Sequence, residues 1–152
     1  MSQVESRLKE LGFELPEAPS PVAAYVGAVR TGNLVFVSGQ GPSKDGESIK
    51  GRVGQDLTLE EGYKAAQLCI LNALAQVKAL VGSLDNVERV VKLLGWVNCT
   101  PDFDQQPFVI NGASELLVNV FGDKGKHARS AVSAHVLPFN IAVEIEMVVE
   151  VK

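Results

Sequence analysis

The chain has 152 residues, of which 46% are hydrophobic and 21% charged, and its formal net charge is −4. A chain of this length buries one adequate core, so we expect residues 1–152 to form a single domain, with an N-terminal helix and extended segment in residues 1–20. The composition excludes a disordered chain, and the acidic balance without a Lys/Arg cluster argues against nucleic-acid binding.

The sequence also bears on location. No segment reaches the roughly 20 apolar residues that span a bilayer, and residues 1–5 lack the basic-then-apolar layout of a secretory signal. We therefore expect a cytoplasmic protein without a membrane partner. The two cysteines, Cys69 and Cys99, form neither a disulfide framework nor a metal-binding spacing.

The first third of the chain predicts a helix followed by extended structure. Apolar side chains at a helical spacing in residues 4–11 indicate a short helix that Gly12 ends, and three prolines then hold the chain extended. Two strands, 24–29 and 34–38, flank a Gly/Asn turn and predict an antiparallel pair. Residues 41–54 are polar and glycine-rich, which indicates an exposed loop with a short strand near Ile49.

Two longer helices are predicted further along. Thr58 and Glu61 form a capping box, so a core helix begins there and continues to Gly82. A second helix is predicted over residues 105–121, where Gly122 ends it.

Three further strands complete the fold class. Residues 87–97 are strand-like, and residues 141–151 alternate apolar and acidic side chains, which places one face on a core. Residues 128–136 are expected to pair with this last strand as a final hairpin through residues 137–140. The order ββ, helix, β, helix, ββ predicts an α+β fold with one mixed, mainly antiparallel sheet and two helices on one face.

No phosphate-binding loop, dinucleotide fingerprint, zinc-ligand set or nucleophile elbow is present. The only histidines, His127 and His135, lie eight residues apart, and a metal site there would need additional carboxylates. We therefore expect neither a metal nor a cofactor.

Arg129 is the most informative candidate residue, because it lies in a run of small side chains on a predicted strand. A guanidinium matches a carboxylate with two parallel hydrogen bonds, so Arg129 could anchor an acidic metabolite; an internal salt bridge to Glu144 or Glu146 is the alternative. In the expected hairpin register, Arg129 and Glu144 share the polar face but lie about 13 Å apart. A three-carbon ligand could not contact both within one subunit, which makes this face a candidate interface as well as a site.

Two separated motifs resemble those of the Rid/YjgF family. The resemblance covers nearly the whole chain in order, and further matches point to a longer subgroup with an N-terminal extension. The N-terminal motif is GNLVFVSGQ (32–40), the C-terminal motif comprises ARSAV (128–132), LP (137–138) and VEIE (143–146), and the subgroup matches are GRVG (51–54) and VINGA (109–113).

The resemblance implies a chorismate-mutase-like homotrimer with ligand clefts between subunits. It also implies an enamine/imine deaminase, a hydrolase that converts 2-aminoacrylate or 2-iminopropionate to the keto acid and ammonia. On that pattern, Arg129 binds the carboxylate of a small metabolite and Glu144 holds or activates the attacking water.

The same pattern assigns further contacts. It places Tyr25, Ser38 and Gly39 along the cleft. It also assigns Asn111 to the cleft, although the connection from its helix to the following strand is longer in this chain than in the family pattern. The family archetype has a cysteine two residues after the arginine, where this chain has Ala131, so only backbone contacts are expected at that position.

Two other functions remain open. The same cleft could serve a non-catalytic carboxylate-binding or regulatory trimer. Relatives of the family also carry the labels endoribonuclease (L-PSP-like) and translation inhibitor, but the acidic charge and few aromatic residues argue against an RNA-binding groove.

Overall fold

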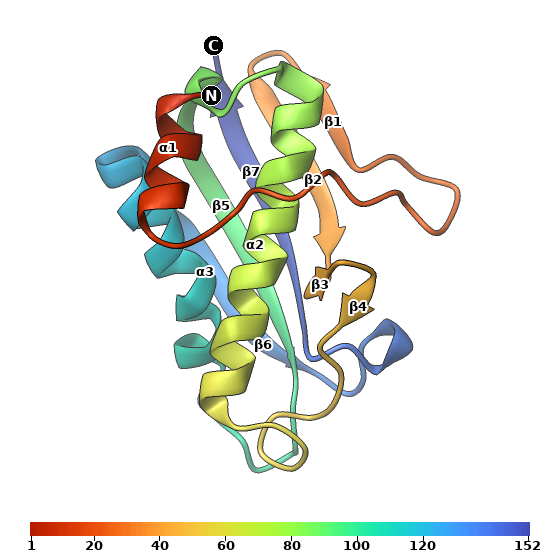
Figure 1. The fold of residues 1–152 in the computed structure, drawn as a ribbon. Coiled ribbons are helices and arrows are strands. Elements are labelled where there is room, and N and C mark those ends of the chain that lie inside the picture. The colour runs from red at the N-terminus through yellow and green to blue at the C-terminus, as the bar shows by residue number, and fades with distance from the viewer.

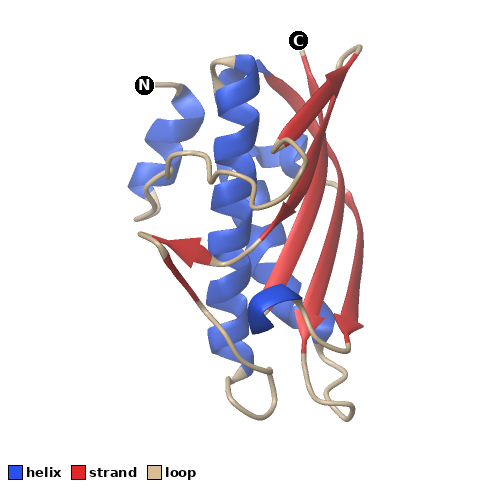
Figure 2. Ribbon diagram, turned by 90° about the vertical axis from the view of Figure 1, so that its right-hand side faces the viewer, coloured by secondary structure: helices blue, strands red, loops and turns tan.

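A computed structural model describes residues 1–152 as a sheet with helices on one face (Figure 1). The five-stranded sheet has the order β1-β2-β7-β5-β6, and β3 and β4 form a small separate hairpin. The α+β class and the two long helices on one face are confirmed (Figure 2). The strands are β1 (Ala28–Thr31), β2 (Leu34–Gln40), β3 (Ser43–Lys44), β4 (Glu47–Ser48), β5 (Val87–Asn98), β6 (Ala128–Ala134) and β7 (Val143–Val151); the helices are α1 (Gln3–Glu10), α2 (Leu59–Val81) and α3 (Gln106–Phe121).

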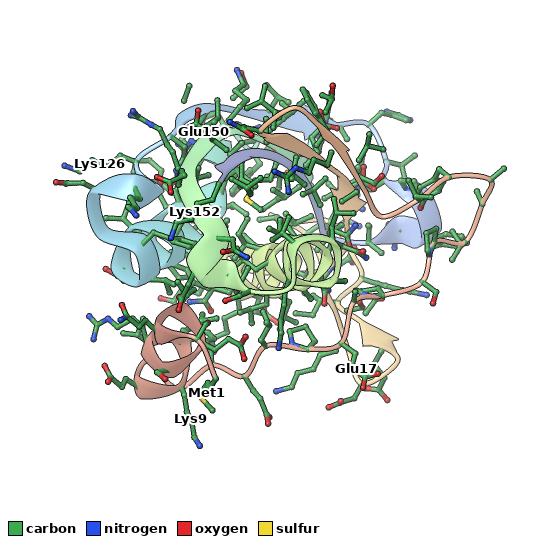
Figure 3. All side chains as sticks on the ribbon, turned by 90° about the horizontal axis from the view of Figure 1, so that it is seen from above. Met1, Lys9, Glu17, Lys126, Glu150 and Lys152 are labelled. Carbon is green, nitrogen blue, oxygen red and sulfur yellow. The ribbon has the colours of Figure 1, made fainter.

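Helix α2 begins at the predicted capping box. The Thr58 hydroxyl accepts a hydrogen bond from the Glu61 backbone N–H at 3.1 Å, and the Glu61 carboxylate accepts one from the Thr58 N–H at 3.1 Å. These two bonds satisfy backbone donors that the first turn cannot use. Figure 3, which looks down on the molecule from above, shows α2 between the sheet and α1. None of the helices combines the length and the apolarity that a membrane span requires.

Helix α3 lies unusually close to α2 at one position. A Cβ atom on Gly112 would lie 2.1 Å from the Tyr63 carbonyl oxygen, so no other residue fits there without moving a helix. This contact fixes α3, and with it the polar side chains that α3 directs toward β6.

Strand β7 shows the predicted alternation. Its odd-numbered residues from Val143 to Val151 are buried beneath the helices, whereas Glu144, Glu146 and Glu150 lie on the opposite face. No helix covers that opposite face, which we call the open face (Figure 2). It also presents apolar side chains, including the exposed Phe36 and Val132.

The predicted hairpin between the last two strands is wrong. Strand β6 pairs only with β5, in parallel, and β5 pairs with β7 antiparallel, so β5 lies between them. The chain passes from β6 to β7 through residues 135–142, where Phe139 and Asn140 adopt positive φ angles of 58° and 59°. Alternation in a sequence shows which face of a strand is buried, but it does not identify the neighbouring strand.

The first predicted strand needs correction, whereas the short strand expected near Ile49 is present. The first strand is β1 at Ala28–Thr31, not residues 24–29, and it joins β2 through a two-residue turn, with Thr31 opposite Leu34. Residues 22–26 are exposed and lie outside the ladder. In the predicted loop 41–54, strands β3 and β4 form a hairpin just before Ile49.

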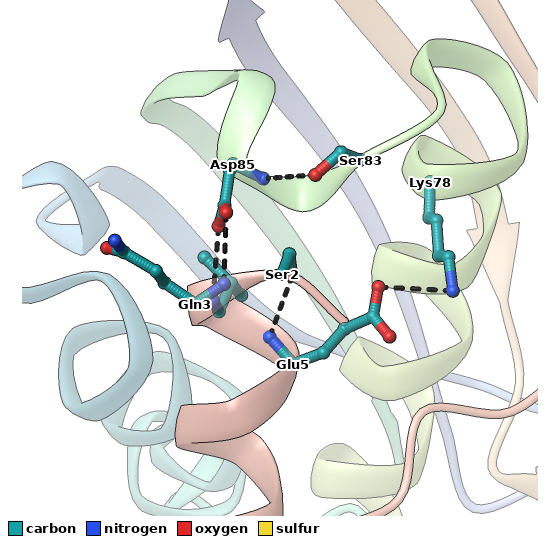
Figure 4. A network of polar contacts seen from close by, with 7 residues as sticks. Ser2, Gln3, Glu5, Lys78, Ser83 and Asp85 are labelled. Carbon is teal, nitrogen blue, oxygen red and sulfur yellow. Dashed lines mark hydrogen bonds and ion pairs between the residues drawn. The ribbon is translucent and has the colours of Figure 1, made fainter.

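The N-terminal helix is attached by the loop that precedes β5 (Figure 4). The Asp85 carboxylate accepts hydrogen bonds from the backbone N–H groups of Gln3 and Val4, at 2.9 and 3.1 Å. Glu5 of the same helix pairs with Lys78 of α2 at 3.1 Å. These contacts connect α1 to both ends of the α2–β5 connection.

We expect the Asp85→Ala variant to lose about 1 kcal/mol of unfolding free energy, the usual contribution of a helix-capping side chain. Asp85→Asn retains one acceptor oxygen and should lose less. Urea denaturation measures both values, and hydrogen exchange should locate the loss in residues 3–10. Equal stability of the three proteins would show that Asp85 contributes nothing to anchoring α1.

Candidate functional site

Glu144, near the start of β7, is the acidic group of the candidate site. It lies beside Gly39, where β2 bulges between Val37 and Gln40, and a Cβ atom on Gly39 would lie 2.8 Å from Glu144 Oε2. A side chain at position 39 would therefore displace the Glu144 carboxylate from its present place. Burial raises the pKa of Glu144, and the negative charge of Glu146 raises it further. Glu144 therefore retains a proton to higher pH than an exposed glutamate and suits a proton-transfer role.

Ser38 precedes Gly39 in β2, and Tyr25 lies in the segment before β1. The Ser38 hydroxyl donates a hydrogen bond to the Val26 carbonyl at 2.7 Å, which holds the segment before β1 against β2. Tyr25 belongs to that segment and is half-exposed. Together with Gly39, Tyr25 lines a cavity of about 120 Å³.

Arg129, on edge strand β6, is the basic group of the candidate site. Its Nη1 donates hydrogen bonds to Asn111 Oδ1 at 2.8 Å and to Ser114 Oγ at 3.2 Å, both on α3. Arg129 is in none of the salt bridges of the structure, so the alternative of an internal salt bridge to Glu144 or Glu146 is wrong. Partial burial without an acidic partner lowers the pKa of the guanidinium.

Ala131 follows Arg129 on the same face of β6. It pairs with Gly95 of β5 and packs against the hydrophobic core, so its methyl group is structural. Neither cysteine replaces the thiol that this position lacks, because both are buried. Burial raises the pKa of the Cys69 thiol well above its usual value, with a further contribution from the charge of Glu144.

The expectation that Arg129 and Glu144 share one face is wrong. Arg129 pairs with Leu93, whose side chain is buried under the helices, whereas Glu144 pairs with Trp96 on the open face. Two strand spacings and three residues along the strands separate them, about 10 Å in each direction. Within one subunit, the group of Tyr25, Ser38, Gly39 and Glu144 is therefore separate from the group of Arg129, Asn111 and Ala131.

Sequence reasoning missed two members of the Arg129 group. Ser114 Oγ lies 2.9 Å from His127 Nε2, and His127 Nδ1 lies 2.6 Å from the Gly125 carbonyl oxygen. The signal that could have revealed Ser114 is its spacing from Asn111, since residues i and i+3 share a helix face. His127 precedes β6 by one residue, so only the tertiary structure brings it to α3.

Comparison with known proteins agrees with this fold. The family model described as "YjgF/chorismate_mutase-like, putative endoribonuclease" matches residues 5–151. Protein TCP17 of Trypanosoma cruzi is 45% identical over 150 residues, which cover 97% of this chain and 94% of that protein.

Two crystal structures mark a close and a more distant relationship. A protein of unknown function from Agrobacterium tumefaciens is 49% identical with a TM-score of 0.93, and the match covers 99% of this chain and 93% of that one. RidA from the Antarctic bacterium Psychrobacter is 29% identical with a TM-score of 0.63, over 89% of this chain and 94% of that one. Because the family model matches almost the whole chain and a relative of 45% identity covers 97% of it, this chain belongs to the YjgF family.

Proposed function

We propose that the protein hydrolyses small 2-imino acids and their enamine tautomers to 2-keto acids and ammonia. The observation that carries the proposal is the state of Arg129. Its guanidinium is partly buried, lacks an acidic partner and is held by two neutral groups, Asn111 and Ser114. A cation arranged in this way is ready to bind a carboxylate from outside the chain. Membership of the YjgF family and the likeness to a RidA structure support the same activity.

The reaction requires little beyond positioning and proton transfer. Arg129 binds the substrate carboxylate, and Glu144 as carboxylate takes a proton from a water whose oxygen adds to the C=N carbon. Glu144 then gives that proton to the nitrogen of the tetrahedral intermediate. Glu144 next takes the hydroxyl proton and passes it to the same nitrogen, so that the C–N bond breaks, the hydroxyl oxygen becomes the keto oxygen, and ammonia leaves. Tyr25, Ser38 and Gly39 would line the cleft around the reacting carbon.

The separation of Arg129 from Glu144 supports a site built between two copies of the chain. A second copy that places its Glu144 group beside the first copy's Arg129 would complete the site. The open face, with its exposed Phe36 and Val132, offers the surface for such an assembly. We propose the homotrimer that the family resemblance implies, since closed rings bury such faces without leaving one open.

Light scattering coupled to size exclusion should give three times the 16.2 kDa mass of the chain at micromolar concentration. A monomer at that concentration would contradict the assembly and leave Arg129 and Glu144 without a common substrate.

The activity is tested with imines that an amino-acid oxidase generates from several amino acids. We expect the protein to accelerate imine decay and keto-acid release above the spontaneous rate, most strongly for small side chains. Binding of the keto acid without any acceleration would instead favour the non-catalytic carboxylate-binding trimer. Since the chain is acidic overall, we do not propose RNA cleavage.

A further inference from the structure

A chain of hydrogen bonds lies behind Arg129, on the side where α3 meets the start of β6. It runs from the Gly125 carbonyl through His127 and the Ser114 hydroxyl to Arg129 Nη1. We propose that Ser114 and His127 are positioning residues that fix the guanidinium plane of Arg129 for its carboxylate ligand. The inference rests on the proposed function and adds two residues to its site.

When the His127 imidazole is neutral, hydrogen-bond chemistry allows one consistent arrangement of protons along this series of hydrogen bonds. A backbone carbonyl can only accept, so His127 Nδ1 carries the proton and donates to Gly125. His127 Nε2 is then an acceptor and takes the hydrogen bond of the Ser114 hydroxyl. The Ser114 oxygen retains a lone pair, which accepts from Arg129 Nη1. Each group thus orients the next, and the Gly125 backbone fixes the chain at its far end.

The consequence for Arg129 is a defined free edge. Nη1 has two N–H groups, and both have partners in Asn111 and Ser114. The Nε–H and the N–H of Nη2 that points the same way form the remaining fork, and neither makes a hydrogen bond within the chain. If Asn111 were its only partner, the guanidinium could rotate about the Cδ–Nε bond. Two acceptors on Nη1 fix its plane instead. The Nε/Nη2 edge is therefore the one that binds the carboxylate.

The contact between Arg129 and the substrate carboxylate is made in both the bound substrate and the transition state, because the carboxylate does not react. Loss of the orientation should therefore raise KM more than it lowers kcat. We expect Ser114→Ala to raise KM for the imine about 3- to 10-fold, the effect of one ordinary hydrogen bond. The inhibition constant of pyruvate, a keto-acid product, should rise by the same factor. Ser114→Thr retains the hydroxyl and should restore most of the affinity.

A double-mutant cycle separates positioning from a general structural role. If His127 acts only through the Ser114 hydroxyl, His127→Ala should weaken pyruvate binding in the wild-type background and add nothing to Ser114→Ala. Asn119→Ala is the matched control, because Asn119 is exposed on the same helix and its side chain makes no hydrogen bond. This control should leave both constants unchanged.

Two results would overturn the inference while leaving the proposed activity intact. One is a change of less than twofold in KM and in pyruvate inhibition for Ser114→Ala. The other is a double variant whose loss equals the product of the two single losses. Pyruvate binding by calorimetry extends the test to a protein that binds without turnover. A wild-type protein that neither hydrolyses imines nor binds pyruvate would remove both the proposed function and this inference.

Discussion

Replacing Arg129 with alanine should lower kcat/KM for imine hydrolysis by at least about 100-fold while the protein stays folded. A charge-assisted hydrogen bond contributes about 1.5 to 3 kcal/mol, and a bidentate pair also orients the substrate for attack. The melting temperature should change little, because the guanidinium is only partly buried and makes no ion pair in the chain. Steady-state kinetics and a thermal melt on the same sample measure both effects.

Lysine at position 129 should not restore the activity, because an ammonium group cannot reproduce the planar fork. Arg30 provides the matched control, since its guanidinium is exposed and binds the carbonyls of Gly32 and Lys152. Arg30→Ala should leave kcat/KM near the wild-type value. A destabilised Arg129→Ala protein with undiminished turnover would reject Arg129 as the carboxylate anchor.

Glu144→Gln should lower kcat by about 100-fold or more, the usual range for loss of a general acid–base group. The Glu144→Gln variant should be no less stable than the wild-type protein at neutral pH. Because the folded-state pKa of Glu144 is raised, the folded state holds this proton more tightly than the unfolded chain. That contribution to stability is present at low pH and is lost as pH rises through the raised pKa. Glutamine removes a poorly solvated charge, so a lower activity would not reflect unfolding.

The pH profile identifies Glu144 more sharply than the loss of rate. If its carboxylate takes the proton from water, kcat/KM should rise with pH through a pKa above that of an ordinary glutamate. Glu146→Gln removes the neighbouring negative charge, so this acid limb should move to lower pH while the activity remains. An unchanged limb in Glu146→Gln, or the same limb surviving in Glu144→Gln, would assign the titration to another group.

Local signals in the sequence predict most of the fold. The capping box at Thr58, the glycine after α2 and the alternation in β7 each act through neighbours in sequence or through one buried face. Short-range interactions therefore determine where these elements begin and end and which face they bury. The boundaries of α2, β5 and α3 were predicted to within one or two residues for this reason.

Strand neighbours could not be predicted in the same way. The last two strands look like a hairpin because few residues separate them, yet the long apolar strand β5 lies between them and pairs with both. This single difference moves Arg129 from the expected open face to the helix side. It also explains why Ser114 and His127 escaped notice, since their proximity to Arg129 depends on the packing of α3 against β6.

Because β5 separates β6 from β7, it alone sets the spacing between Arg129 and Glu144 in each subunit. Arg129 is opposite Leu93 and Glu144 is opposite Trp96, three residues further along the same strand. Deleting one residue between them would shift one half of the site by about 3.3 Å and turn its side chains to the other face of the sheet. Relatives with the same activity should therefore keep the length of this stretch of β5 unchanged.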